Sequence, residues 1–391
     1  MPFIHSPEVR RRDALGWPQR RAVRLDGVAG GHRAGAGHAL PLRGGGGGVL
    51  HGSTCEAVVC TLAAARDRAL AELGHAGIVR LVVYASDQTH ATFQKGASIV
   101  GIPPANFRVL RTTASSGYGL TADAVRRAVE EDVAAGLVPL YLCATIGTTG
   151  VGAIDRVREL GHVATRYGMW MHIDAAYAGS AAICPEFQGH LDGAELADSV
   201  SMNPHKWFLT NMDCCCLWVA KPATLTSALS TDPEYLKNVS GDMSKTTTTD
   251  TAIDYKDWQI ALSRRFRAIK LWVVLRRYGA AGMREYIQNH VRMAEWFERA
   301  VRADEWFEVV VPRHFSLVCF RLRPRLVEAP NRELVNAVNA SGRAFMTHFI
   351  VDGKFVIRLA VGGPMTEMRH LQDAWDLIKE KANQLLSETV N

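Results

Sequence analysis

The residues best suited to chemistry are a lysine, an aspartate and a glycine-rich segment. Lys206 follows His205 directly, and Asp174 follows the apolar run 169–173. A lysine amine held in a crowded, partly apolar loop can attack a carbonyl group and form a Schiff base. A carboxylate that apolar neighbours desolvate needs a cationic partner. These residues therefore indicate covalent chemistry on a carbonyl compound, with a cation close to Asp174.

Pyridoxal phosphate supplies both the carbonyl group and the cation. Its protonated pyridine nitrogen would pair with Asp174, and this pairing makes the ring an electron sink. Its phosphate would bind where Gly48 to Cys55 open a helix and offer backbone N–H groups and hydroxyls. Asp174 and Lys206 taken singly also fit structural roles. It is their combination that favours pyridoxal phosphate chemistry.

Several other kinds of chemistry lack their usual signatures. The glycine run Gly44–Gly48 does not continue as G-x-G-x-x-G, because Val49 stands where the second glycine is needed. The sequence also holds no G-x-x-x-x-G-K-[ST], no H-E-x-x-H and no G-x-S-x-G. Dinucleotide binding, P-loop phosphoryl transfer, zinc proteolysis and hydrolysis by a nucleophile elbow therefore have no support.

The charge of the chain is concentrated at its N-terminus. The 391 residues carry a formal net charge of +6, but residues 1–43 hold eight of the 45 Lys and Arg and three of the 39 acidic residues. The rest of the chain is nearly neutral, so nucleic acid is not an expected partner. No apolar run reaches the ~18 residues of a membrane span, and no membrane association is expected.

The eight cysteines indicate a reducing compartment and no metal site. Cys214, Cys215 and Cys216 are consecutive in an apolar stretch, and adjacent strand residues point to opposite faces. They therefore cannot converge on one metal ion, and buried free thiols are the expected state. The N-terminus carries no apolar signal segment, which favours a cytoplasmic protein.

Alternating short apolar strands and amphipathic helices predict an α/β fold with a mostly parallel sheet. The expected helices cover about 54–73 (opened by the capping box Ser53 to Glu56), 121–135 and 155–167, and the expected strands cover 78–85, 97–101, 137–145, 169–173 and 199–202. Polar residues follow several of these strands. Ligands bind at the carboxyl ends of strands in such sheets, so these positions mark the expected site.

Two domains are expected because the chain is too long for one core. Residues 1–43 form an atypical Gly/Arg-rich extension, 44–275 a large cofactor-binding domain with a loop at about 231–251, and 276–391 a smaller C-terminal α+β domain. The smaller domain should contain strands at 307–311, 316–322 and 354–360, with helices at about 281–302, 331–340 and from 366. A further helix is expected just before it, at about 263–278.

Two motifs carry a family resemblance. His172 to Gly179 (HIDAAYAG) and Asn203 to Trp207 (NPHKW) resemble the group II pyridoxal-phosphate-dependent decarboxylases, and more narrowly the plant aromatic L-amino acid decarboxylases. The resemblance extends from about residue 44 to the C-terminus. It implies the aspartate aminotransferase-like fold of PLP-dependent transferases (fold type I), an aromatic L-amino acid substrate and a homodimer.

The resemblance also implies roles for single residues. Lys206 would carry the cofactor, Asp174 would pair with the pyridine nitrogen, and His90 would stack on the ring. His205 would lie on the substrate side and relay protons. Further cofactor contacts are implied for residues at the helix start and at two strand ends, namely Ser53, Thr54, Cys55, Thr145 and Asn203.

Two positions bear on the reaction and the substrate. Tyr235 matches the family's loop tyrosine, which donates a proton in decarboxylases and is Phe in the related aldehyde synthases. Ser263 matches a position that is Ser in tyrosine-type members and Gly in tryptophan-type members. Together they favour decarboxylation of tyrosine or dopa to the aryl amine and CO2.

Alternatives stay open at this stage. Tryptophan decarboxylation and aromatic aldehyde formation would use the same fold. Residues 1–43 do not match the family's N-terminal helical segment, which supplies part of the substrate pocket and of the dimer. A third expectation is therefore a catalytically weak protein that binds cofactor or forms heterodimers with intact relatives.

Overall fold

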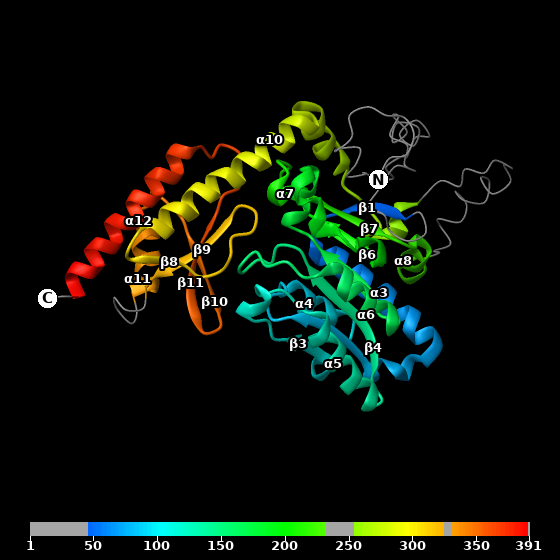
Figure 1. Cartoon of the computed structure of the whole chain (residues 1–391). Helices are drawn as coiled ribbons and strands as arrows, with labels where there is room; N and C mark the ends of the chain where they lie inside the picture. Colours follow the sequence, from blue (N-terminus) through cyan, green and yellow to red (C-terminus); the bar gives the residue numbers. More distant parts are fainter. Residues whose placement is uncertain (1–45, 232–253, 324–329, 390–391) are drawn as a thin grey trace.

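The computed structural model describes residues 46–231, 254–323 and 330–389, and its larger part is built on a seven-stranded sheet (Figure 1). The strand order is β1-β7-β6-β5-β4-β2-β3. The strands are β1 (Gly47–His51), β2 (Leu81–Ser86), β3 (Phe107–Leu110), β4 (Val138–Thr145), β5 (Trp170–Asp174), β6 (Ser199–Met202) and β7 (Cys215–Val219). The five strands from β6 to β3 in this order are parallel, while β7 is antiparallel to both of its neighbours. The predicted α/β fold with a mostly parallel sheet is confirmed.

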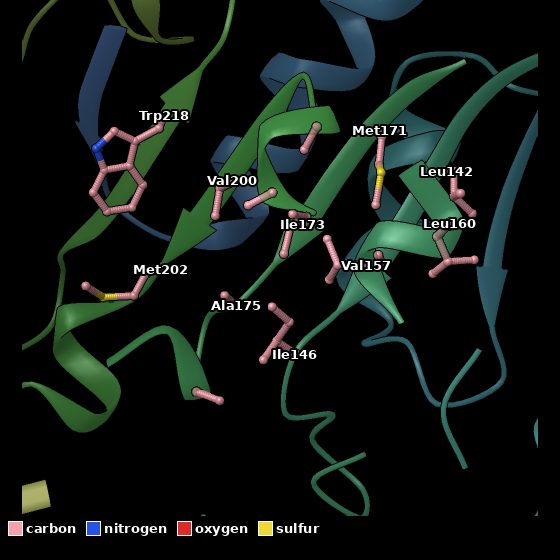
Figure 2. Packing of buried hydrophobic residues seen from close by; sticks show 14 of the residues in the cluster. Leu142, Ile146, Val157, Leu160, Met171, Ile173, Ala175, Val200, Met202 and Trp218 are labelled. Atoms are coloured by element: carbon pink, nitrogen blue, oxygen red, sulfur yellow. The ribbon is translucent and has the colours of Figure 1, made fainter. Parts of the chain in front are cut away.

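Helices cover both faces of this sheet. One face packs against α3 (Thr54–Leu73), α4 (Thr92–Ile99) and α8 (Pro222–Leu229), and the other against α5 (Ala122–Ala134) and α6 (Val157–Arg166). Figure 2 shows the second face, where Leu142, Met171 and Ile173 lie close to Val157 and Leu160. Because both faces are buried, β2 and β4 carry mostly apolar side chains on both sides, as is typical of parallel sheets.

The start of α3 follows the predicted cap at Ser53, and α5 has a similar cap that was not predicted. Ser53 is the N-cap of α3, and its Oγ accepts a hydrogen bond from the Glu56 amide at 3.5 Å. Thr121 caps α5 in the same way through the Ala124 amide. The three consecutive cysteines divide between the two faces, since Cys215 belongs to one core cluster and Cys214 and Cys216 to the other. The predicted alternation of these side chains is confirmed.

One predicted strand is wrong. Residues 97–101 end a helix, α4, instead of forming a strand. Gly96 explains the difference, because a Cβ at this position would lie 3.0 Å from Val58 Cγ1 and 3.2 Å from a Leu62 methyl carbon. The missing side chain lets α4 approach α3 closely, so Ala97 and Val100 are buried while Ile99 faces outward. The strand predicted from Ile78 begins later, at Leu81, after a 3-10 segment.

The smaller part contains a four-stranded sheet of order β10-β11-β9-β8. Its strands are β8 (Phe307–Val309), β9 (Leu317–Leu322), β10 (Thr347–Val351) and β11 (Lys354–Ala360). Helices α11 (Pro330–Ala340) and α12 (Met368–Thr389) pack against it together with α10 (Ala268–Ala303). Of these strands, β10 was not predicted. The two helices predicted on either side of residue 280 are one element with a break at Gly279 (φ +60°), a conformation that glycine adopts readily.

The long helix α10 connects the two parts (Figure 1). Leu271 near its start belongs to a core cluster of the large sheet, while Phe297 and Val301 belong to that of the small sheet. We propose that the domain boundary lies near residues 275 and 276, within this helix. In the described part of the chain, no helix combines the length and the apolar character that crossing a bilayer would require.

Candidate active site

Three neighbouring strands end in polar side chains at the same edge of the large sheet. Thr145 is the last residue of β4 and Asp174 the last of β5, and the two are register partners. Ser201 of β6 is the register partner of Asp174 on the other side, and Asn203 follows that strand. The predicted gathering of Thr145, Asp174 and Asn203 at the carboxyl ends of parallel strands is therefore present.

Asp174 lies in the position expected for a carboxylate that meets a buried cation. Its side chain is buried, and Oδ1 accepts a hydrogen bond from the Ala176 amide at 2.9 Å. The other oxygen, Oδ2, receives no hydrogen bond from the described residues. A buried carboxylate with one free oxygen is costly unless a further partner binds there.

Lys206 lies on a single helical turn, α7 (Pro204–Trp207), that follows β6. Pro204 occupies the first helical position, where a missing N–H costs nothing. The Lys206 amide donates to the Asn203 carbonyl at 3.0 Å, and the Lys206 side chain is exposed in the single chain. The turn therefore presents the amine outward from a rigid support at the same sheet edge as Asp174.

His205 is held by the backbone of the neighbouring strand. Its Nδ1 lies 2.7 Å from the Cys214 carbonyl oxygen and 3.0 Å from the Cys214 amide nitrogen. Partial burial lowers the pKa of His205, so the ring is neutral at physiological pH. With Nδ1 engaged by Cys214, Nε2 is the ring atom that remains for proton transfer.

The start of α3 lies at the same edge and is tied to α7. The Thr54 hydroxyl donates to Asn203 Oδ1 at 2.9 Å. The Glu56 carboxylate accepts from the Gly52 amide at 2.8 Å instead of from the N-cap amide. The amides of Ser53, Thr54 and Cys55 precede the first intrahelical donor and point out of the helix. They form a suitable site for a phosphate group.

A second helix start lies beside the first. The thiol of Cys55 and the hydroxyl of Thr92, the first residue of α4, lie 2.7 Å apart. Cys55 is exposed, whereas the other seven cysteines are buried. Three helix starts, those of α3, α4 and α7, are thus connected around one area.

His90 lies between the end of β2 and the start of α4. Its Nδ1 accepts from the Thr92 amide at 3.1 Å, which places the ring proton on Nε2 and fixes the ring against the helix start. The preceding loop is anchored because Asp87 Oδ1 accepts from the Thr112 hydroxyl at 2.6 Å. His90 is exposed in the single chain, so one ring face is available for stacking.

The site has two orphaned buried polar atoms, and they fit pyridoxal phosphate. Thr145 Oγ1 and Gln88 Oε1 are buried without any hydrogen-bond partner among the described residues. Buried polar atoms are otherwise almost always paired, so an unpaired one calls for an explanation. A polar ligand at this edge would supply partners for Thr145 and for Asp174 Oδ2. The helix starts would bind its phosphate, and Lys206 would bond to its aldehyde carbon.

Of two further predicted residues, Tyr235 lies outside the described residues, and Ser263 is not brought to this cluster. Ser263 is exposed, and its carbonyl accepts from Gln259 Nε2 at 3.1 Å. No hydrogen bond in the described ranges joins Ser263 to another predicted site residue.

The residues that fix the strand ends were not predicted from the sequence. The buried Asp155 accepts from the amides of Thr145 and Leu120, both at 2.7 Å, and thereby holds the end of β4. Burial raises the pKa of Asp155 to about 6 despite these hydrogen bonds. Its signal was weak, since Asp155 is the first residue of a predicted helix and resembles an ordinary helix-start acid. His172, Ser199 and Ser201 were also missed, although alternation along the strands places them on the face of Asp174.

The small domain reaches this edge through aromatic and polar contacts. The hydroxyls of Tyr177 and Ser316 lie 2.7 Å apart, and Trp207 Nε1 donates to His290 Nδ1 at 3.0 Å. The rings of Tyr177 and Trp207 stack with centroids 5.0 Å apart. Trp207 follows Lys206 directly, so the packing between domains also fixes the turn that carries the lysine.

Fold and site together define a class of enzyme. A mostly parallel sheet with a lysine turn, a carboxylate and connected helix starts at its carboxyl edge is the arrangement of a fold type I enzyme that uses pyridoxal phosphate.

Comparisons with known proteins identify the family. Residues 35–323 match the pyridoxal-dependent decarboxylase conserved domain. Phenylacetaldehyde synthase of a Rosa hybrid cultivar is 53% identical over 88% of this chain and 69% of its own length. Tyrosine decarboxylase 1 of Narcissus pseudonarcissus is 53% identical over 88% of this chain and 68% of its own length. The crystal structure of Oryza sativa TDC with PLP and tryptamine has a TM-score of 0.83 and 48% identity, over 87% of this chain and 71% of that one.

The chain belongs to the pyridoxal-dependent decarboxylase family and, within it, to the plant aromatic amino acid decarboxylase type. The predicted cofactor, pyridoxal phosphate, and the predicted family are confirmed. The relatives include tyrosine decarboxylases, tryptophan decarboxylases and aldehyde synthases, so the comparisons leave the substrate and the product open.

Proposed function

We propose that the protein decarboxylates an aromatic L-amino acid, preferably tyrosine or dopa, to the aryl amine and CO2. The observation that carries this proposal is the placement of Lys206, Asp174 and the start of α3 at one sheet edge, with Thr54 bonded to Asn203. When bound, pyridoxal phosphate supplies an electron sink for the electrons of the broken bond to the carboxylate.

Different described residues hold different parts of the cofactor. We assign the phosphate to Ser53, Thr54 and Cys55 at the start of α3, with Asn203 fixing Thr54. Asp174 pairs with the pyridine nitrogen, and the Lys206 amine bonds to the aldehyde carbon. Thr145 supplies a hydroxyl that has no hydrogen-bond partner in the described part of the chain. His90 stacks on the ring, in an orientation set by the Thr92 amide.

Two residues move protons in this proposal. His205 is neutral because burial lowers its pKa, and Nε2 can accept or donate a proton on the substrate side. The Tyr235 hydroxyl would return a proton to the substrate α-carbon after CO2 has left. The support for Tyr235 is its place in the family motif from Asp232 to Lys237.

Ser263 supports a phenolic substrate. A hydroxymethyl group at this position occupies space that the larger indole of tryptophan would need, and such size selection is typically worth ~1–3 kcal/mol. Relatives with tyrosine decarboxylase names and relatives with tryptophan decarboxylase names match this chain about equally. The preference for tyrosine or dopa therefore rests on Ser263 alone.

We also propose a homodimer. Ser263 lies in the segment 260–273, most of whose large apolar side chains are exposed in the single chain, Phe266 by 65%. The others are Ile260, Leu262, Ile269, Trp272 and Val273. Met212, exposed by 78%, precedes Asp213, which accepts from Arg267 of this segment at 2.8 Å. Exposed apolar side chains in this number are typical of an interface. A second copy that covers this surface would bury the surroundings of Ser263. The enclosed space between the two copies would let Ser263 contact the substrate.

The free thiols of the chain support a cytoplasmic location in this proposal. Seven buried free cysteines and one exposed one suit a reducing compartment, which supports a cytoplasmic protein.

Product analysis tests the proposed reaction. The purified chain with pyridoxal phosphate is incubated with tyrosine, dopa, tryptophan or phenylalanine, and CO2, amine, aldehyde and hydrogen peroxide are measured. We expect tyramine or dopamine with CO2 in equal amounts and no peroxide. Aldehyde with peroxide would identify an aldehyde synthase, tryptamine as the main product would reverse the substrate assignment, and cofactor binding without turnover would identify a catalytically weak protein.

Light scattering of the eluted protein tests the dimer. We expect twice the mass of one chain, and we expect Phe266→Glu to yield single chains. A wild-type protein that elutes as a single chain would contradict the proposed homodimer.

A further inference from the structure

The C-terminal end of the lysine turn α7 is bonded to α10, the helix that connects the two domains. Trp207 ends the turn, and its indole Nε1 donates to Nδ1 of His290 on α10 at 3.0 Å. Both side chains are buried. An indole N–H can only donate, and in the described ranges this one makes no second hydrogen bond. The position of the Trp207 indole therefore depends on the acceptor that His290 offers.

The imidazole of His290 is itself fixed in one orientation. Because Nδ1 accepts from Trp207, the ring proton lies on Nε2, and Nε2 is the atom that can donate to the Gly363 carbonyl. The Tyr286 ring packs edge-on against the imidazole, with centroids 4.3 Å apart. Burial lowers the pKa of His290, and the hydrogen bond to Gly363 only opposes this shift, so the ring is neutral at physiological pH.

The other hydrogen bonds of this turn come from the large domain. Asn203, which precedes it, accepts from Thr54 at 2.9 Å, and His205 Nδ1 lies 2.7 Å from the Cys214 carbonyl oxygen. Within the described part of the chain, the bond from Trp207 is the only side-chain hydrogen bond that joins residues 204–207 to α10. A single helical turn is too short to be stable by itself, so these few contacts set its position.

We propose that His290 is a positioning residue for Lys206, because it holds the Trp207 indole and thereby the turn from which the lysine amine reaches the cofactor. Without an acceptor, the buried indole N–H would turn toward another partner, since an unpaired buried donor is costly. Lys206 precedes Trp207 in the same turn, so its amine would be displaced with the indole. This inference rests on the proposed bond between Lys206 and pyridoxal phosphate.

Two variants of nearly equal size isolate the acceptor. His290→Leu removes both ring nitrogens, whereas His290→Asn places an amide oxygen near the position of Nδ1 and keeps a donor. Both leave a similar space unfilled, so a difference between them reports the hydrogen bond and not the lost volume.

Three quantities are measured on the full chain with pyridoxal phosphate bound. The dissociation constant of the cofactor is read from the cofactor absorbance that the protein retains on serial dilution. The visible circular dichroism per bound cofactor reports its orientation, because pyridoxal phosphate has no chiral centre and acquires this signal from the protein. The melting temperature reports stability.

We expect His290→Leu to weaken cofactor affinity by about tenfold, the order of one unsatisfied buried donor, and to change the visible circular dichroism. His290→Asn should restore most of both. Equal affinity and equal circular dichroism in the two variants would overturn the inference. If His290→Leu does not fold, Trp207→Phe removes the donor of the same bond and should change both quantities in the same direction, and wild-type values in that variant would overturn the inference as well.

Tyr286→Phe is the matched control. The Tyr286 hydroxyl donates to the Gly362 carbonyl at 3.0 Å, so it joins the same helix to the segment that contains Gly363 but makes no bond to α7. The variant keeps the ring that packs against His290. It should lower the melting temperature and leave cofactor affinity and circular dichroism unchanged. Losses equal to those of His290→Leu would show that loosening of α10 is responsible and would contradict the role of the Trp207 bond.

Lys206→Ala separates the two possible failures. If Lys206→Ala keeps the visible absorbance of the bound cofactor, the proposed bond between Lys206 and the cofactor is wrong. If Lys206→Ala loses this absorbance while His290→Leu matches the wild-type protein in affinity and circular dichroism, the bond stands and only the positioning role of His290 is wrong.

Discussion

The hydroxyl of Thr54 donates to Asn203 Oδ1 at 2.9 Å, and this bond joins the first turn of α3 to the residue that precedes the lysine turn α7. The two residues are 149 positions apart in the chain. Both are buried, so the bond is shielded from water. This bond therefore helps to fix the phosphate-binding helix start relative to the turn that carries Lys206.

Thr54→Val is expected to weaken pyridoxal phosphate binding by about tenfold. Valine keeps the shape of threonine but leaves Asn203 Oδ1 without its donor, and an unsatisfied buried acceptor costs ~1–3 kcal/mol. The dissociation constant can be read from cofactor absorbance. Thr61→Val is the matched control, because Thr61 is buried on the same helix and bonds to Tyr141 instead. A cofactor affinity that falls equally in both variants would show that general loosening of α3, and not the Asn203 contact, is responsible.

Lys206→Ala is expected to abolish both turnover and the visible absorbance of the bound cofactor. The variant Lys206→Arg should lose them as well, because a guanidinium keeps the charge but cannot form the covalent bond. Lys221→Ala, at an exposed lysine before α8, is the control that should retain both. Visible absorbance that persists in Lys206→Ala would assign the covalent bond to another amine.

The sequence predicted the strand-end residues well because each of them follows a predicted strand. Asp174 after 169–173 and Asn203 after 199–202 could be placed at one edge by the rule for parallel sheets alone. Strand β3 was missed because Arg108 interrupts a run of four residues. In the structure its guanidinium bonds to the buried Asp132, Nε to Oδ2 at 3.0 Å.

The remaining features depend on register and on contacts between distant segments, which single-residue patterns do not contain. His172, Ser199 and Ser201 look like ordinary polar strand residues until the pairing of β5 with β6 makes them neighbours. The bond from Thr54 to Asn203 likewise requires the order of the strands. Gly96 was the overlooked signal for α4, since a glycine inside an apolar run permits close helix packing.

Stability should fall on acidification in a way that depends on His172. Because burial lowers the pKa of His172 to about 4, the folded state binds fewer protons than the unfolded state between pH 6.5 and 4. The contribution of this group is complete above pH 6.5 and is lost as the pH falls, by about 2 kcal/mol between pH 7 and pH 5. Unfolding free energies from denaturant titrations at several pH values measure it. His172→Gln should have a shallower dependence over this range, and identical slopes for the two proteins would refute the assignment.

Tyr235→Phe is expected to turn amine formation into aldehyde formation. The phenolic hydroxyl is the proposed proton donor to the substrate α-carbon, and without it dioxygen reacts there instead. The products from the amino acid, O2 and water are then aldehyde, CO2, ammonia and hydrogen peroxide. Peroxide and ammonia assays together with product chromatography test this. An unchanged amine yield would assign the proton transfer to another group, most directly to His205.

Ser263→Gly is expected to shift selectivity from tyrosine toward tryptophan. Removing the hydroxymethyl group frees about the volume that distinguishes an indole from a phenol ring, and one such group in a pocket changes discrimination by ~1–3 kcal/mol, or roughly tenfold or more. The ratio of kcat/KM for the two amino acids is the quantity to compare.

Ser263→Gly should have little effect on stability, because Ser263 is exposed and its side chain has no hydrogen bond to the described residues. The melting temperature should stay within a degree or two of the wild-type value, as is usual for surface substitutions of about 0.5 kcal/mol or less. Ser227→Gly, on the exposed part of α8, provides a control at a site with no proposed substrate contact. A kcat/KM ratio that stays constant in Ser263→Gly would remove the support for a phenolic substrate and leave tyrosine and tryptophan equally favoured.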